Sequence, residues 1–251
     1  MRTPALILLC SLLPASALAR DKDAAGLFDK PAKVAKVPLP TDPQFPKTKP
    51  VVSCSYFKGF AVKAIDRGEV GAELSIVPLA GGAEAYQCRE AAASGEIAIS
   101  ENWSGYFKGA KGTYIFFDAA DGQNGGLGFA IFSPDGKKLF DDTAKSWHAA
   151  DLKPSGLALR YTRVYAAECS LYADPAGCWA KVRQATGLTQ GPAPDCAAQY
   201  KAEEKRMKGT PNQAKVASIP SAVDYEAVVT LEGGQSTISA GEGKVACRLP
   251  D

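Results

Sequence analysis

The sequence has few of the residues and motifs that many enzyme sites need. It contains a single histidine, His148, which excludes any site that requires two histidines. No serine lies in a GxSxG motif, and no GxxxxGK[ST] phosphate loop is present. The formal charge is only +2, with both signs mixed, and this balance argues against a nucleic-acid-binding protein. We therefore assign no catalytic residue from the sequence.

Long hydrophobic runs are also scarce, and the main one lies near the N-terminus. Arg2 is followed by an apolar stretch over residues 5–13 and then by the small residues Ala17 and Ala19. This order is typical of a secretory signal peptide, and we expect residues 1–19 to be cleaved after Ala19. The apolar run is shorter than the ~20 residues that span a bilayer, and no later run approaches that length. The sequence predicts an exported protein, periplasmic or secreted, that is not integral to the membrane.

The cysteine count agrees with export. Besides Cys10 in the apolar run, the chain has Cys54, Cys88, Cys169, Cys178, Cys196 and Cys247. An even number of cysteines in an exported chain indicates disulfides, although spacing alone does not fix their connectivity. We favour the simplest sequential pairing, namely Cys54–Cys88, Cys169–Cys178 and Cys196–Cys247. A zinc site is disfavoured because no close C-x2-C pair is present and no histidine lies near these cysteines.

Glycine (24 residues) and proline (17 residues) are abundant and favour a turn-rich β protein. Short runs of β-branched and aromatic residues between glycine-rich turns predict strands. We expect them near residues 60–65, 73–79, 85–89, 95–101, 113–118, 128–132, 138–140, 156–165, 226–231, 235–240 and 244–249. Residues 175–207 form a helical insert in this interpretation, since Pro175 suits a helix start and Gly187 a helix end. The predicted fold is an antiparallel β-sandwich or meander with one or two short helices.

The predicted domain organisation follows the proline distribution. Residues 20–50 are rich in proline and lysine, which indicates a flexible leader. Residues 51–251 would form one β domain that the disulfides cross-link.

Two stretches carry a resemblance to known proteins. The segment 131–139, IFSPDGKKL, resembles one strand–turn–strand unit of the propeller repeats in TolB-like periplasmic proteins. This resemblance implies an alternative fold, a small or incomplete β-propeller. The stretches WSGYFKG at 103–109 and FFDAADG at 116–122 resemble exported bacterial proteins of uncharacterised function, which implies no particular activity.

Aromatic and acidic residues around positions 102–126 are the candidate site residues. Trp103, Tyr106 and Tyr114 either pack in the core or form an aromatic platform for a sugar or a partner protein. Asp118, Asp121 and Asn124 lie on a glycine-rich stretch and could bind calcium through oxygen ligands, but a hairpin turn needs the same residue types.

Two functions are consistent with these features. The first is an exported, non-enzymatic binding or accessory protein whose partner is a protein or a glycan at the cell envelope. The alternative is an exported glycan hydrolase that uses a pair of carboxylates, with or without calcium.

Overall fold

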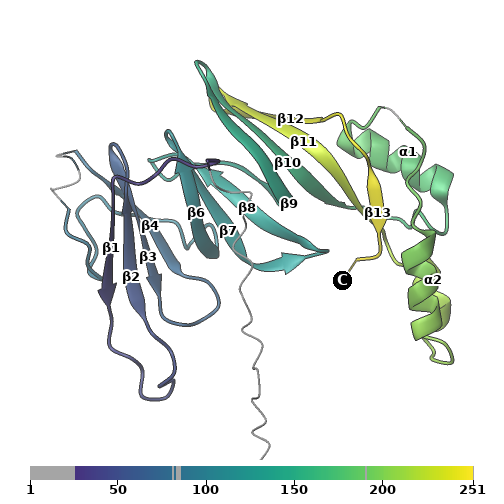
Figure 1. Cartoon of the computed structure of the whole chain (residues 1–251), viewed down its shortest axis with the longest axis horizontal. Coiled ribbons are helices and arrows are strands. Elements are labelled where there is room, and N and C mark those ends of the chain that lie inside the picture. Colours follow the sequence, from purple (N-terminus) through teal and green to yellow (C-terminus); the bar gives the residue numbers. More distant parts are fainter. Residues whose placement is uncertain (1–25, 81, 83–85, 190, 251) are drawn as a thin grey trace, which may run out of the picture.

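The computed structural model describes residues 26–80, 82, 86–189 and 191–250. The predicted signal peptide, residues 1–19, lies outside this part of the chain. The described chain forms two antiparallel sheets, with the helices gathered at one end (Figure 1).

The N-terminal sheet, sheet A, has five strands in sequential order. They are β1 (Lys33–Pro38), β2 (Val51–Tyr56), β3 (Phe60–Asp66), β4 (Glu73–Pro78) and β5 (Ile97–Ala98). Each strand pairs with the next, so the sheet is a meander. Residues 86–96 contain no strand, and we call them the strandless segment. The Cys54–Cys88 disulfide ties this segment to β2.

The second sheet, sheet B, has eight strands. They are β6 (Gly105–Lys111), β7 (Tyr114–Gln123), β8 (Gly126–Phe132), β9 (Lys138–Lys153), β10 (Gly156–Ala166), β11 (Ala222–Glu232), β12 (Gln235–Ala240) and β13 (Ala246–Arg248). The order runs from β6 to β12 without a crossover, and β13 pairs with β11 beyond the end of β12.

Strand β9 is long because its first part pairs with one strand and its second part with another. Its first part, Lys138 to Ala144, pairs with β8. Its second part, Ala144 to Lys153, pairs with β10. Sheet B therefore consists of two halves, β6–β8 and β10–β13, that are joined through this one strand.

The two faces of the β6–β8 half contact different cores. Phe117 and Phe132 pack against Phe60 and Ile76 of sheet A. The residue before Phe117, Phe116, belongs instead to a larger core that extends over β9–β11 and the helices. This alternation is the period of two that a strand imposes on neighbouring side chains, and it makes the β6–β8 half the middle layer of the molecule.

Capping residues mark both ends of the first helix. Helix α1 (Pro175–Thr186) starts after Asp174, whose Oδ1 accepts from the N–H of Gly177 at 2.9 Å, and it stops at Gly187 with φ 73°. Helix α2 spans Ala197–Arg206, and a 3-10 helix, η3, spans Gln213–Ser218.

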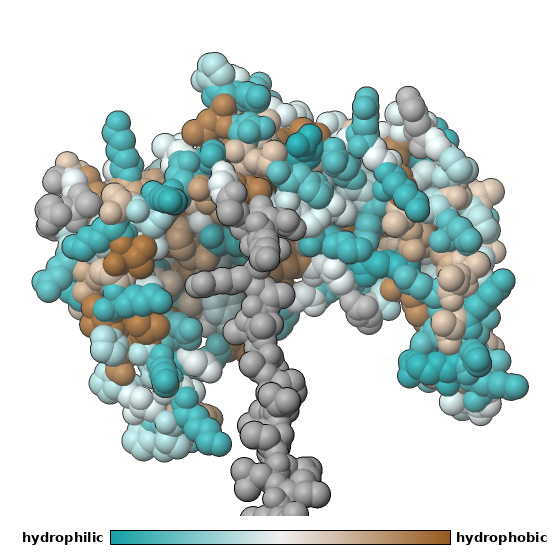
Figure 2. All heavy atoms as spheres, viewed as in Figure 1, coloured by the Kyte–Doolittle hydropathy of each residue, from teal (hydrophilic) through white to brown (hydrophobic). Residues whose placement is uncertain are grey.

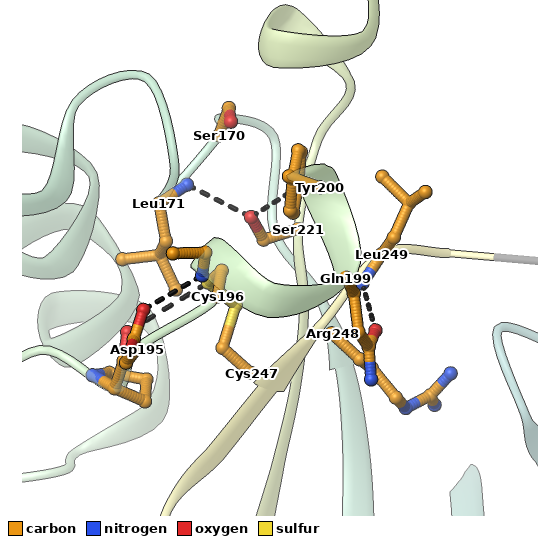
Figure 3. The surroundings of a disulfide bond; sticks show 12 residues. Ser170, Leu171, Asp195, Cys196, Gln199, Tyr200, Ser221, Cys247, Arg248 and Leu249 are labelled. Atoms are coloured by element: carbon orange, nitrogen blue, oxygen red, sulfur yellow. Dashed lines mark hydrogen bonds between the residues drawn. A yellow bond between two sulfur atoms is a disulfide. The ribbon is translucent and has the colours of Figure 1, made fainter. Parts of the chain in front are cut away.

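Two disulfides hold the helices to the sheet. Cys169–Cys178 joins the segment that follows β10 to α1, and Cys196–Cys247 joins the start of α2 to β13 (Figure 3). The buried Tyr200 of α2 adds a hydrogen bond between its hydroxyl and Ser221 Oγ at 2.8 Å. The three bonded pairs are those of the simplest sequential scheme.

The mainly β, antiparallel fold with two short helices in the predicted insert is confirmed. The flexible-leader interpretation of residues 20–50 was wrong for part of that segment, because β1 lies within it and pairs along its whole length with β2. The expected strand at 85–89 is absent from Tyr86 onward. Residues 131–139 do form a strand–turn–strand, the β8–β9 hairpin, but in an eight-stranded sheet rather than in a propeller blade.

A buried ion pair fixes the strandless segment against sheet A. Lys63 on β3 is only 2% exposed, and its Nζ lies 2.5 Å from Glu96 Oε1. The same carboxylate accepts from Ser75 Oγ at 2.6 Å and from the N–H of Ala93 at 2.7 Å. Burial acts to raise the pKa of Glu96, but these bonds from Lys63, Ser75 and Ala93 outweigh burial and lower it.

Replacing Lys63 by methionine should destabilise the protein strongly. The Glu96 carboxylate would then be left buried without its cation, a change that typically costs about 3–5 kcal/mol. Chemical unfolding monitored by circular dichroism measures the loss. Lys36→Met, at an exposed position of β1, is the matched control and should change the free energy of unfolding by less than about 0.5 kcal/mol. Equal effects for the two variants would contradict the structural role of the pair.

The Glu96 contribution should also depend on pH in one direction. Because the folded state lowers the pKa of Glu96 below its ordinary value of 4.5, its contribution is fully present above that value and disappears as the pH falls through the folded-state pKa. The difference in unfolding free energy between the natural chain and Glu96→Gln should therefore shrink between about pH 6 and about pH 3. A difference that stays constant or grows on acidification would show that the pair does not carry this linkage.

Candidate functional site

The three predicted aromatic residues do not form one platform. Trp103 is half-buried, packs against the core between the sheets, and donates from Nε1 to the backbone oxygen of Asp118 at 3.2 Å. Tyr106 is 40% exposed, and its hydroxyl accepts from the N–H of Gly71 at 3.0 Å. Tyr114 lies at the opposite end of the β6–β7 hairpin and packs against the larger core. Their main contacts are structural.

The predicted calcium ligands are likewise dispersed along a strand and its turn. Asp118 forms an ion pair with Lys108 at 3.0 Å. Asp121 is exposed at an irregularity where the β7–β8 register shifts, and Asn124 occupies the following turn with φ 52°. Among the described residues, no three histidine, cysteine or acidic side chains gather as a metal site would require. Asn124 lies in the hairpin turn, whereas Asp118 and Asp121 belong to strand β7.

A buried polar cluster that sequence reasoning missed lies where β9 separates from β10. Asp142 accepts hydrogen bonds from the Tyr161 hydroxyl and from Arg163, whose Nη1 donates to the Tyr225 hydroxyl at 2.8 Å. Burial and the Asp142 charge raise the pKa of the Tyr161 hydroxyl. Burial also opposes the charge of Arg163, but Asp142, Tyr225 and Tyr161 together outweigh burial and raise the pKa of the guanidinium. These groups satisfy one another, so the cluster holds the two halves of sheet B together.

A cavity lies at one end of sheet A, between two of its connections. We call it the loop pocket. Its volume is about 650 Å³, within the range typical of small-molecule sites. It is lined by Pro40, Thr41, Asp42, Pro43, Phe45, Thr48, Pro50, Arg67, Gly68 and Glu69.

Strand register brings the two walls of the loop pocket together. Val51, the first residue of β2, pairs with Asp66, the last residue of β3. The β1–β2 loop therefore leaves sheet A at the same end as the β3–β4 turn. One wall comes from residues 40–50 and the other from residues 67–69.

The β1–β2 loop is ordered by its own hydrogen bonds. Asp42 accepts from the N–H of Gln44 through Oδ1 at 2.8 Å and from the N–H of Phe45 through its backbone oxygen at 2.9 Å. The backbone oxygen of Phe45 in turn accepts from the N–H and the hydroxyl of Thr48. Prolines on both sides restrict φ. The loop is thus a preformed wall, and it leaves the Phe45 ring 60% exposed.

The opposite wall depends on a glycine. Gly68 has φ +83°, and its N–H donates to Asp66 Oδ1 at 2.8 Å. A Cβ at this position would lie 2.6 Å from Thr48 Cγ2. Only glycine lets the β3–β4 turn approach the β1–β2 loop this closely.

Arg67 supplies a fixed positive charge at the loop pocket. Its Nε donates to Glu73 at 2.6 Å and one Nη to Glu90 at 3.0 Å. These hydrogen bonds, with Glu73 first and Glu90 second, raise the pKa of Arg67. Its other terminal nitrogen, Nη1, has no hydrogen-bond partner among the described residues. A bound oxygen atom could therefore accept from it.

The loop pocket combines an apolar surface with separate polar groups. Its prolines and Phe45 provide flat apolar area, Arg67 provides a donor, and Asp42 and Glu69 provide exposed carboxylate acceptors. On the face seen in Figure 2, hydrophobic residues form separate patches among hydrophilic ones rather than one continuous surface. This arrangement suits a small ligand better than a broad apolar partner.

Comparison with known proteins assigns no family to the chain. No family model, no curated protein and no solved structure matches it. Within the part of the chain that the structure describes, no helix has the length and apolar character needed to cross a membrane.

Replacing Gly68 by alanine should open or distort the loop pocket. The variant combines the strain of a positive φ with a clash against Thr48, and we expect a loss of about 2–4 kcal/mol of stability. Gly59→Ala is the matched control, because Gly59 also has a positive φ (+89°) but a Cβ at that position would have no atom within 4 Å. It should lose only about 1 kcal/mol. Thermal unfolding compares the two, and equal losses would show that close approach to Thr48 is unimportant.

Proposed function

We propose that this chain is an exported, non-enzymatic binding protein whose ligand site is the loop pocket. The observation that carries the proposal is the preformed cavity of about 650 Å³ between the β1–β2 loop and the β3–β4 turn. Both walls are held by hydrogen bonds that exist without a ligand. A preformed site reduces the entropy lost on binding, which is what a binding protein needs.

Export is the part of the proposal that rests on the sequence and the cysteines. The N-terminal segment has the order of a signal peptide. The three disulfides are compatible with an oxidising compartment outside the cytosol. The proposed site of action is therefore the cell envelope or its surroundings.

A carbohydrate is the ligand class that fits the chemistry of the loop pocket. A sugar ring presents an apolar face of C–H groups, which can stack on an exposed aromatic ring such as Phe45. Its hydroxyls can accept from Arg67 and donate to Asp42 or Glu69. The cavity can hold a short oligosaccharide, and its open position would allow the rest of a longer glycan to continue into solvent.

The hydrolase alternative has less support. A glycoside-cleaving general acid needs a carboxyl group whose pKa is raised, usually by apolar burial. The carboxyl groups of the described residues with a clearly displaced pKa are Glu96, Asp135 and Glu203, and hydrogen bonds lower the pKa of all three. Asp42 and Glu69 at the loop pocket are both exposed, a setting that favours binding over acid catalysis.

Removing the Phe45 ring should abolish most of the affinity for sugar. We expect Phe45→Ala to weaken binding of short oligosaccharides at least about tenfold, because an aromatic stacking surface contributes on the order of 1–2 kcal/mol. Isothermal titration calorimetry with cello- and chito-oligosaccharides measures it. Phe45 is largely exposed, so the variant should unfold at an unchanged temperature.

Leu152→Ala is the control variant, because it removes an exposed apolar side chain outside the loop pocket. It should leave the affinity unchanged. If Phe45→Ala binds these sugars as tightly as the natural chain does, the loop-pocket proposal is wrong. If none of these sugars binds the natural chain, the carbohydrate assignment fails.

A further inference from the structure

The side chain of Arg248 contains a buried nitrogen that has no partner among the described residues. Its Nη2 is buried and makes no hydrogen bond there. Its Nε donates to the two carboxylate oxygens of Asp224 at 3.1 and 3.2 Å. Buried donors are almost always satisfied, and one that is left unsatisfied lowers stability. This guanidinium can therefore bind one more acceptor.

The charge of the group around Arg248 is also unbalanced. Asp224 is only 4% exposed. It shares its carboxylate between Arg248 and Lys145, whose Nζ lies 2.6 Å from Oδ2. In this group of three side chains, two positive charges are matched by one negative charge. A second carboxylate beside the guanidinium would complete the group, because hydrogen bonds between two charged groups are stronger than those between neutral ones.

The β7–β8 turn lies directly on this guanidinium. A Cβ at Gly125 would lie 2.7 Å from Nη1 of Arg248 and 3.3 Å from Nη2. The next residue, Gly126, is buried, and a Cβ there would lie 2.7 Å from Cγ2 of Val164 on β10. Glycine at both positions allows this close approach. The turn, which belongs to the β6–β8 half of sheet B, therefore contacts the β10–β13 half.

The same turn contains Asn124 followed by Gly125, the only asparagine–glycine pair in the chain. Asparagine deamidates most readily before glycine, because a residue without a side chain lets its nitrogen approach the asparagine amide. Asn124 is half-buried and Gly125 is exposed, so water can reach the turn. The N–H of Gly125 has no hydrogen-bond partner among the described residues. The nitrogen that must react is therefore not held by another bond.

We propose that Asn124 deamidates in the folded protein and that Arg248 binds the carboxylate that forms. The Gly125 nitrogen attacks the side-chain carbonyl carbon of Asn124 and forms the new C–N bond of a succinimide ring. The bond from that carbon to the side-chain nitrogen breaks, and this nitrogen leaves as ammonia with the proton of the Gly125 N–H. Water then hydrolyses one C–N bond of the ring, which leaves an aspartate or an isoaspartate at position 124.

The new carboxylate arises next to the unpaired donor. In the aspartate it ends the side chain of residue 124, and in the isoaspartate it replaces the carbonyl that preceded Gly125. Both positions are adjacent to Gly125, the residue on which the guanidinium lies. The reaction adds a bond between the β7–β8 hairpin and β13, so it fastens the two halves of sheet B at a point away from β9. This inference does not depend on the loop pocket.

Peptide mapping by mass spectrometry tests the modification. The oxidised chain without residues 1–19 is incubated at mildly alkaline pH and then digested with trypsin. We expect the mass of the peptide that covers residues 112–137 to rise by one unit, and fragmentation should place the change at Asn124 rather than at the glutamine before it. Asn102 and Asn212, which precede larger residues, are the controls in the same chain and should remain unmodified.

Thermal unfolding of variants tests the role of Arg248. Asn124→Asp, which supplies the carboxylate directly, should raise the unfolding midpoint by about 2–4 °C, the shift expected for one charge-assisted hydrogen bond in a chain of this size. Asn102→Asp makes the same change of charge at an exposed position and should give no rise. In Arg248→Gln, where Lys145 still pairs with Asp224, Asn124→Asp should give no rise either.

Each measurement has a result that would overturn the proposal. For the modification, it is an Asn124 peptide of unchanged mass, or equal modification of all three asparagines. For the role of Arg248, it is an Asn124→Asp chain that is no more stable than the natural chain, or one that is stabilised to the same extent in Arg248→Gln. The mass measurement uses the natural chain, so it stands even if a variant fails to fold.

Discussion

The continuity of β9 is the constraint on which the rest of the structure depends. Because its first part pairs with β8 and its second part with β10, one strand sets the position of both halves of sheet B. Sheet A packs on the β6–β8 half through the core that contains Phe117 and Phe132, whereas the disulfide-linked helices pack on the β10–β13 half. Where β9 leaves β10, the Asp142–Arg163 pair at 2.8 Å and the Tyr161 hydroxyl replace the missing backbone ladder with side-chain bonds. A buried network of this kind is stable only when every member is satisfied.

Much of the fold could be predicted from the sequence because local signals and the final structure agree. Asp174, Pro175 and Gly187 mark the ends of α1 as their chemistry requires. Strand β1 was missed for a physical reason. Its lysines and the prolines around it resemble a flexible linker, but Pro38 ends an edge strand, where a missing N–H breaks no ladder. The same residues that suggested disorder therefore protect the edge of sheet A.

The candidate site could not be predicted in the same way, because its parts are distant in sequence and carry no distinctive signal alone. Phe45 lies among prolines, and Arg67 lies in a tight turn sixteen positions after Val51. What brings them together is the pairing of Val51 with Asp66, and strand register is a property of the whole sheet rather than of a short segment. The aromatic cluster at 102–126 was the more visible signal, but its density reflects the middle layer of the fold, where β7 contributes to two cores.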